Sequence, residues 1–203
     1  MENLWSISDR AAWHAALDRY VQVIAEQGSS RLPELDRWYR EDLTMSLPAR
    51  RPPHVTHAEL VRVVEWKMAR GVWRQRNLLL VRSNEPATVE QVSQHALLRI
   101  PDAVAPISSL ARLAGVGPAT ASAIIAAAAP DRYPFFDEVV ADQVPGLGKV
   151  AFTLGYYRQY ADALRDRSAQ LGRDWTPALV ERALWSFAGG KAGRRLETSS
   201  APT

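Results

Sequence analysis

Hydrophobic positions recur at helical spacing along most of the chain. Between residues 9 and 26, apolar and aromatic side chains return every three to four residues, which predicts an amphipathic helix. The same spacing predicts helices over about 33–43, 56–82, 87–99 and 106–113. No stretch alternates apolar and polar residues as a half-buried β-strand does. The pattern therefore predicts an all-α protein.

Local signals place several helix ends. Thr56 and Glu59 form a capping box, in which the hydroxyl and the carboxylate bind free amides at a helix start. Three prolines in residues 46–55 predict a loop. Further helices are predicted over about 149–171 and from the cap Thr176 to about residue 187.

The order of these elements predicts two lobes. One lobe comprises residues 56–142, and the other combines residues 1–55 with residues 143–188. Residues 189–203 are rich in glycine, serine and charge, which predicts a disordered tail.

Composition narrows the protein class. The 203 residues are 47% hydrophobic and 23% charged, as is ordinary for a soluble globular protein. No apolar run approaches the roughly 18 residues that span a bilayer, and the N-terminus lacks a signal-peptide pattern. We therefore expect a cytoplasmic monomer without membrane contact. The chain has no cysteine, which excludes a cysteine-held iron–sulfur cluster, and the scattered histidines predict no metal site or cofactor.

A helix of small residues follows a Gly-Val-Gly turn. Gly115 and Gly117 suit a turn too tight for side chains, and Val116 is placed to fill the gap between two helices. Pro118 suits the first position of the second helix, and Ala121 allows close helix approach. Such a turn presents backbone amides at a positive helix N-terminus, where they bind a phosphate without reading sequence.

Residues 106–128 resemble the helix-hairpin-helix family, with leucine, alanine and isoleucine at matching positions around the two glycines. The resemblance implies that this motif binds the DNA backbone. The residues that it assigns to DNA binding are Gly115, Val116, Gly117, Ala119 and Thr120. The alternative is a tight turn between two helices that contacts no partner.

The sequence Phe-Phe-Asp-Glu follows at residues 135–138. Base-excision DNA glycosylases of the endonuclease III-like superfamily carry a catalytic aspartate in a loop after such a hairpin, and Asp137 stands at that position. The resemblance covers about residues 110–142. It implies that Asp137 stabilises the positive charge that builds on the sugar as the bond to a flipped base breaks, with Glu138 as a second carboxylate. Phe135 and Phe136 are expected to desolvate the site and line the base pocket.

The chain departs from that superfamily in two respects. Ala119 replaces the lysine that forms a Schiff base in the lyase-type members, which implies an enzyme that removes the base and leaves an abasic site. Glu138 and Val139 replace the usual threonine and histidine after the aspartate. The alternative role for Asp137 is that of a helix N-cap only.

Residues 62–82 carry six basic side chains against one acid, Glu65. This local excess indicates a polyanion partner. We expect Arg70, Arg74 and Arg76 to contact DNA phosphates, and Trp66 and Lys67 to line the base pocket. The alternative is that the tryptophans belong to the core and that the arginines pair with acids. Residues 146–149 lack the spacing of a phosphate-binding loop and predict a second tight turn.

The resemblance implies a monofunctional DNA glycosylase that acts on double-stranded DNA. The base is either damaged or a modified base of foreign DNA, such as phage DNA, and the sequence does not decide between them. One alternative is a non-catalytic helix-hairpin-helix DNA-binding protein. Another is an RNA-binding or structural module.

Overall fold

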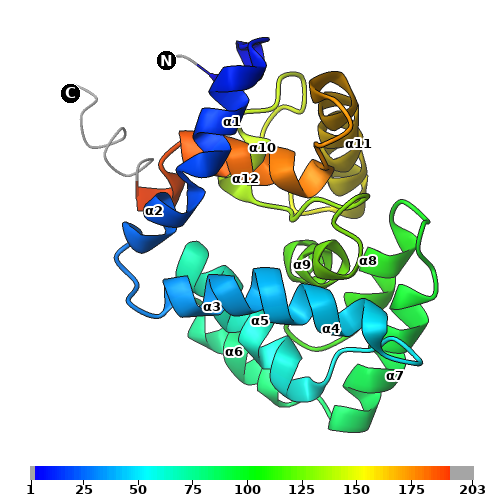
Figure 1. The fold of residues 1–203 in the computed structure, drawn as a ribbon. Helices are drawn as coiled ribbons and strands as arrows, with labels where there is room; N and C mark the ends of the chain where they lie inside the picture. Colours follow the sequence, from blue (N-terminus) through cyan, green and yellow to red (C-terminus); the bar gives the residue numbers. More distant parts are fainter. Residues whose placement is uncertain (1–2, 193–203) are drawn as a thin grey trace.

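The structure is a computed structural model that describes residues 3–192, and all regular elements in that range are helical (Figure 1). The predicted all-α class is confirmed. The first helices are α1 (Arg10–Asp18), α2 (Tyr20–Ala25), α3 (Leu32–Trp38), α4 (Thr44–Ala49), α5 (His57–Arg70) and α6 (Gln75–Arg82). The later helices are α7 (Pro86–Leu97), α8 (Ala105–Leu110), α9 (Pro118–Ala128), α10 (Glu138–Ala141), α11 (Leu154–Leu171) and α12 (Pro177–Phe187). A 3-10 turn (Leu4–Ser6) precedes α1, and a π-helical segment (Tyr39–Leu43) joins α3 to α4.

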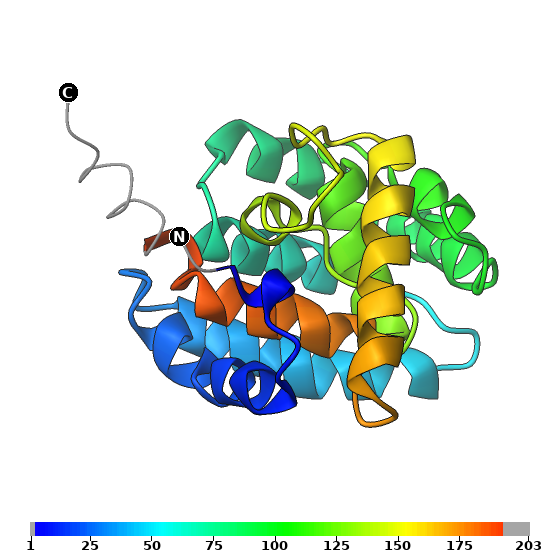
Figure 2. The same cartoon turned by 90° about the horizontal axis from the view of Figure 1, so that it is seen from above.

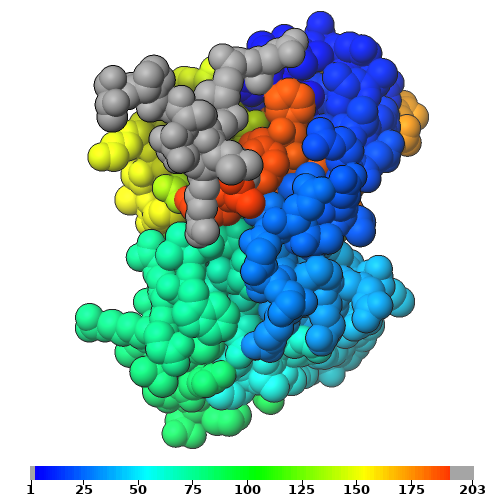
Figure 3. Space-filling view, turned by 90° about the vertical axis from the view of Figure 1, so that its left-hand side faces the viewer, coloured from blue at the N-terminus to red at the C-terminus, as the bar shows by residue number. Residues whose placement is uncertain are grey.

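The helices form two lobes, which Figure 1 shows one above the other. The upper lobe contains α1, α2, α10, α11 and α12, and α12 packs against the other four. Figure 2 shows α12 in orange running alongside α1. The lower lobe contains α3 to α9, with α5 packed against α3, α6, α7 and α9. Figure 3 shows the chain between α2 and α3 passing from one lobe to the other.

The lobe boundaries differ from the predicted ones at residues 55 and 142. Helices α3 and α4 belong to the lower lobe, because their apolar side chains pack on α5 and α9. The hydroxyl of Tyr39, between them, donates a hydrogen bond of 2.6 Å to the carbonyl of Ala123 in α9. Helix α10 packs on α12 and so belongs to the upper lobe.

Two of the predicted helices are shorter than expected. The chain turns at Arg19, so the helix predicted over 9–26 is divided into α1 and α2. The helix predicted to continue through Gly71 ends at Arg70, because the backbone of Gly71 (φ −123°, ψ −111°) lies outside the helical region. The Thr56–Glu59 capping box is confirmed.

The prolines and the C-terminal part also differ from the prediction. Helix α4 extends to Ala49 and includes Pro48, which the predicted loop over 46–55 excluded. Pro48 has no amide to donate to the carbonyl of Thr44, and the helix ends one residue later, at Ala49. The helix predicted from 149 begins at Leu154, with Thr153 as its N-cap. Of the predicted tail, Gly189 and Ala192 form hydrogen bonds with Gln27, and residues 193–203 lie outside the described residues.

Helix α9 is the central helix of the lower lobe. Its residues 119–127 are all buried, and most of them are alanine. A helix that is apolar on all sides is stable only when surrounded by other elements, and the small side chains let its neighbours approach closely. The first turn of this central helix reaches the boundary between the lobes, where a pocket lies.

Candidate active site

The turn from α8 to α9 is held against α6. Gly115 has φ +73°, and a Cβ atom there would lie 2.7 Å from the carbonyl oxygen of Asn77 and 2.9 Å from Val81. The side chain of Asn84 accepts a hydrogen bond of 2.9 Å from the amide of Ala114 and donates one of 3.0 Å to its carbonyl. Glycine at 115 is therefore required by the fold itself.

Gly117 is not required by the fold in the same way. Its backbone is extended (φ −97°, ψ 178°), and a Cβ atom there would meet nothing within 4 Å. Gly117 is exposed at the N-terminus of α9, and no side chain within residues 3–192 caps that terminus. Val116 is buried in the gap between the helices, as predicted. The first amides of α9 therefore have no side-chain acceptor among the described residues, and this helix end is positive.

Thr120 lies at the start of α9, and its side chain is buried in the described structure. A contact of Thr120 with DNA would therefore be made by its backbone amide, and that contact stays a prediction. Ala119 is also buried, but it lines the pocket next to the turn.

The pocket lies between the two lobes and has a volume of about 130 Å³. The end of α5 and the loop after it form one wall, the segment around the aspartate forms the other, and α9 begins at the floor. The lining residues are Lys67, Arg70, Gly71, Val72, Arg74, Ala119, Phe135, Phe136, Asp137, Glu138, Val139, Phe152 and Lys191. Residues from both lobes therefore complete the site.

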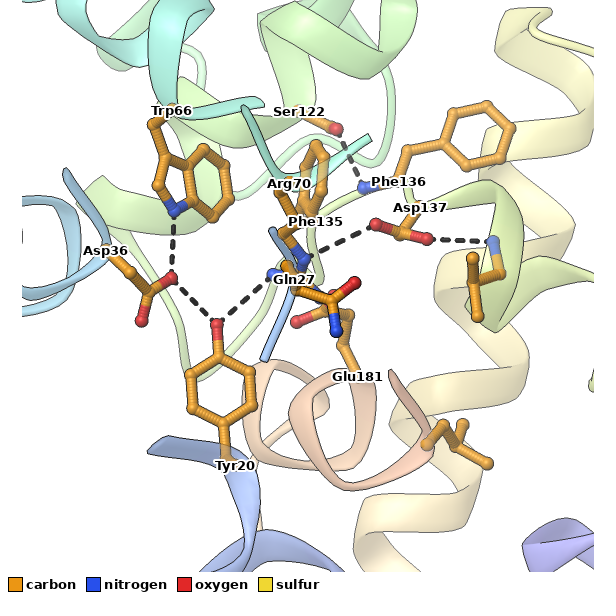
Figure 4. A network of polar contacts seen from close by, with 12 residues as sticks. Tyr20, Gln27, Asp36, Trp66, Arg70, Ser122, Phe135, Phe136, Asp137 and Glu181 are labelled. Atoms are coloured by element: carbon orange, nitrogen blue, oxygen red, sulfur yellow. Dashed lines mark hydrogen bonds and ion pairs between the residues drawn. The ribbon is translucent and has the colours of Figure 1, made fainter. Parts of the chain in front are cut away.

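Asp137 caps α10 and faces this pocket (Figure 4). Its Oδ1 accepts a hydrogen bond of 2.8 Å from the amide of Val139, and its Oδ2 lies 3.4 Å from Nε of Arg70. The preceding amide of Phe136 donates a hydrogen bond of 2.9 Å to the hydroxyl of Ser122 in α9. The carboxylate is therefore held in place by the helix that it caps and by a contact with the central helix.

Arg70 is buried between two carboxylates and does not reach the surface, with only 1% of its area exposed. Its Nη2 forms an ion pair with Glu181 of α12, and its Nε faces Asp137. The predicted contact of Arg70 with a DNA phosphate is therefore wrong. The charge of Arg70 is already engaged by two acids inside the protein.

A buried polar network continues from Glu181 into the lower lobe. Arg40 lies 3.7 Å from Glu181 and 3.7 Å from Asp36, and it donates a hydrogen bond of 2.8 Å to the hydroxyl of Tyr20. Tyr20 in turn donates a hydrogen bond of 2.8 Å to Asp36. Burial raises the pKa of Glu181, while Arg70 and Arg40 act in the opposite direction. Charged groups of both lobes thus meet behind the pocket.

Trp66 belongs to the core and not to the pocket. It is wholly buried, stacks on Tyr39 with ring centroids 3.7 Å apart, and donates a hydrogen bond of 2.8 Å to Asp36. Its predicted place in the base pocket is wrong, because its indole fills the space between α5 and the π-helical segment. Phe135 and Phe136 line the interlobe pocket, although little of either ring is exposed, and that this pocket takes a base stays a prediction.

Lys67 lines the pocket as predicted, and its ammonium makes no hydrogen bond or ion pair with any described residue. Burial lowers the pKa of Lys67, the nearby charge of Arg74 lowers it further, and Asp137 opposes both. Glu138 lies at the pocket edge, where its half-exposed carboxylate is 3.4 Å from Nζ of Lys191. Asp137 and Glu138 are therefore placed differently, with only Asp137 held inside.

Arg74 lines the pocket and Arg76 follows it two residues later; both are exposed, and neither forms an ion pair with a described residue. Val72 and Trp73 in the same loop are each 49% exposed, as is Phe152 across the pocket. Neither Glu181 nor Phe152 is predicted from the sequence as a site residue. Glu181 carries a signal, since it stands on the apolar side of α12, three residues from both Ala178 and Leu184.

Comparison of the chain with protein-family models, with curated proteins and with solved structures finds no match. No helix within residues 3–192 is both long and apolar enough to cross a membrane. The same residues contain no group of three or more histidine, cysteine or acidic side chains arranged to hold a metal ion.

Proposed function

We propose that the protein is a DNA glycosylase that flips a damaged or modified base of double-stranded DNA into the interlobe pocket and hydrolyses its glycosidic bond. The observation that carries this proposal is the position of Asp137. Its carboxylate is fixed by a cap, faces a pocket and lies near an uncovered helix N-terminus. A carboxylate in such a pocket is suited to stabilise positive charge on a sugar.

DNA docking rests on the exposed turn and the exposed arginines. The turn at Gly117 offers amides to one phosphate, and open space around this glycine lets a DNA backbone approach closely. Arg74, which lines the pocket, and Arg76, two residues further along, offer cations that have no ion-pair partner in residues 3–192. Together they would direct the strand across the pocket opening, so that a flipped nucleotide enters between them.

The proposed reaction leaves an abasic site. The C1′–N bond breaks with its electron pair on the base, and Asp137 stabilises the positive charge on the sugar. Water then forms the C1′–O bond, and its proton is transferred to the base. Ala119 carries no amine, so this residue supplies no Schiff base to the sugar.

The contact between Asp137 and Arg70 bears on this role. A cation beside the carboxylate weakens its effect on a positively charged sugar. Glu181 binds the Nη2 end of the same guanidinium, so Asp137 faces only Nε, at 3.4 Å. We infer that Glu181 compensates Arg70 and leaves the Asp137 carboxylate with negative charge toward the pocket.

The second candidate function is that of a non-catalytic DNA-binding protein. The observation in its favour is that Asp137 already has two structural roles, as the cap of α10 and as the partner of Arg70. These roles would explain the aspartate without chemistry. The turn and the arginines would serve DNA binding equally well in such a protein.

Base release from duplex DNA distinguishes the two functions. Duplexes with single damaged or naturally modified bases are incubated with the wild-type protein and with Asp137→Asn, and free bases are identified by mass spectrometry. Asparagine keeps an oxygen that caps α10, so fold and DNA binding should survive. Release by the wild type and not by Asp137→Asn supports the glycosylase. Binding of the duplexes by both proteins, with release by neither, supports the non-catalytic DNA-binding protein.

A further inference from the structure

The charges around the pocket are unevenly paired. Arg70 is compensated by Asp137 and Glu181, and Lys191 is compensated by Glu138. Lys67 has no such partner among the described residues, although the pocket contains its side chain. Its charged neighbours are Asp137, which forms no ion pair with it, and another cation, Arg74, which also lacks an ion-pair partner in residues 3–192.

An ammonium without a hydrogen-bond or ion-pair partner in a partly buried pocket favours a ligand that accepts a hydrogen bond from it. Polar groups that lose water without gaining a partner are costly, and a ligand oxygen that accepts a hydrogen bond from the ammonium removes that cost. A ligand with a fixed positive charge does the opposite, because it adds a like charge at short range. The pocket also has an apolar part, in which the half-exposed ring of Phe152 is available to contact a flat ring, whereas Phe135 and Phe136 expose little of their rings.

We propose that Lys67 makes this pocket selective for neutral bases with carbonyl oxygens that gain negative charge as the base departs, and that it excludes bases with a fixed positive charge. This inference rests on the proposed base-excision function. The substrate class comprises deaminated, oxidised or otherwise modified bases that leave as anions. Purines alkylated at N7 of guanine or N3 of adenine, which carry a full positive charge in the nucleoside, lie outside it.

The bond-breaking step gives Lys67 a role in the reaction as well as in binding. When the C1′–N bond breaks, its electron pair stays with the base and spreads onto a carbonyl oxygen. The ammonium donates a hydrogen bond to that oxygen, whose charge increases in the transition state. Water adds to C1′, and the proton that it loses neutralises the departed base. Asp137 stabilises the positive charge on the sugar, and Lys67 stabilises the negative charge on the base.

The test compares two sets of duplexes. One set carries uracil, 5-hydroxymethyluracil, hypoxanthine or 8-oxoguanine, and the other carries 7-methylguanine or 3-methyladenine. We expect the wild type to release at least one base of the first set and none of the second. Lys67→Gln removes the charge and should slow release about 100-fold, the size of effect seen when one oxyanion donor is lost. Lys67→Arg should retain part of the activity, and Lys149→Gln, which changes an exposed lysine outside the pocket, should retain all of it.

Binding to the Asp137→Asn protein decides the inference even if no base is released. Fluorescence anisotropy with the same duplexes should show tighter binding of the first set, and the double variant Asp137→Asn/Lys67→Gln should lose this preference. If the wild type releases no base but the binding preference for the first set is observed, the proposed function is contradicted and the pocket selectivity is supported. Release of the methylated purines, or an unchanged preference in the double variant, would overturn the role of Lys67.

Discussion

Arg70 and Glu181 form a wholly buried ion pair that joins the two lobes. Arg70 lies at the end of α5 in the lower lobe, and Glu181 lies in the second turn of α12 in the upper lobe. Nε of the same arginine faces Asp137. The contact that holds the lobes together therefore also determines the charge beside the candidate catalytic carboxylate.

Breaking this pair should destabilise the protein strongly. Glu181→Ala leaves the guanidinium of Arg70 buried with one acid instead of two, and removal of one partner of a buried pair costs about 3–5 kcal/mol. Urea unfolding measures the loss. Glu34→Ala, which breaks the exposed pair with Arg62, is the matched control and should cost less than about 1 kcal/mol. Equal losses in the two variants would contradict a structural role for the buried pair.

The two glycines of the turn should respond differently to substitution. Gly115→Ala places a Cβ against Asn77 and keeps a positive φ, so we expect a loss of about 2 kcal/mol in unfolding free energy. Gly117→Asp meets open space and should change stability by less than about 0.5 kcal/mol. It should nevertheless weaken DNA binding at least about tenfold, because it places a carboxylate against a phosphate. Normal DNA affinity of Gly117→Asp would show that the turn contacts no phosphate.

Arg74 and Arg76 should contribute to DNA affinity through charge. Each phosphate contact that is lost should reduce the slope of log affinity against log salt by about 0.9. We therefore expect Arg74→Gln and Arg76→Gln each to lower affinity and to flatten that slope, as measured by anisotropy over a salt series. Arg31→Gln, which removes an arginine paired with Glu65, serves as the control. An unchanged slope in all three variants would place the DNA elsewhere.

Base release should decline at alkaline pH. Burial and the charge of Arg74 lower the pKa of Lys67, while Asp137 raises it, with the result below that of a free lysine. As the pH rises through this pKa, the ammonium loses its proton and can no longer stabilise the departing base. Single-turnover rates between about pH 7 and about pH 10 should therefore fall. In Lys67→Arg the decline should move to higher pH, because a guanidinium keeps its proton. An identical decline in that variant would assign it to another group.

The sequence predicts the helical class and much of the pocket, because those features have local signals. The capping box at Thr56 and the cap at Thr176 are confirmed, since each depends on residues three positions apart. Phe135, Phe136 and Asp137 stand together in the sequence and line one wall of the pocket. Lys67 lines the same pocket because it lies in the last turn of α5, which ends at the pocket wall.

The predictions that the structure contradicts concern contacts between segments that are distant in the sequence. Arg70 looks like a surface arginine in a basic stretch, and its burial depends on Glu181, which lies 111 residues later. Trp66 lies in the core because it stacks on Tyr39 and donates a hydrogen bond to Asp36. Both of these residues come from the segment that the sequence analysis placed in the other lobe. A helical period shows which side of a helix is apolar, but it does not show which segment covers that side.

The most direct test of the account is base release by the wild-type protein and by Asp137→Asn on the same panel of duplexes. We predict that the wild type releases a base and leaves an abasic site, and that Asp137→Asn binds the same duplex without releasing the base. Release that persists in Asp137→Asn would remove the aspartate from the chemistry. Absence of release by the wild type across the panel, with salt-dependent binding retained, would contradict the glycosylase and leave a DNA-binding protein in which Asp137 caps a helix.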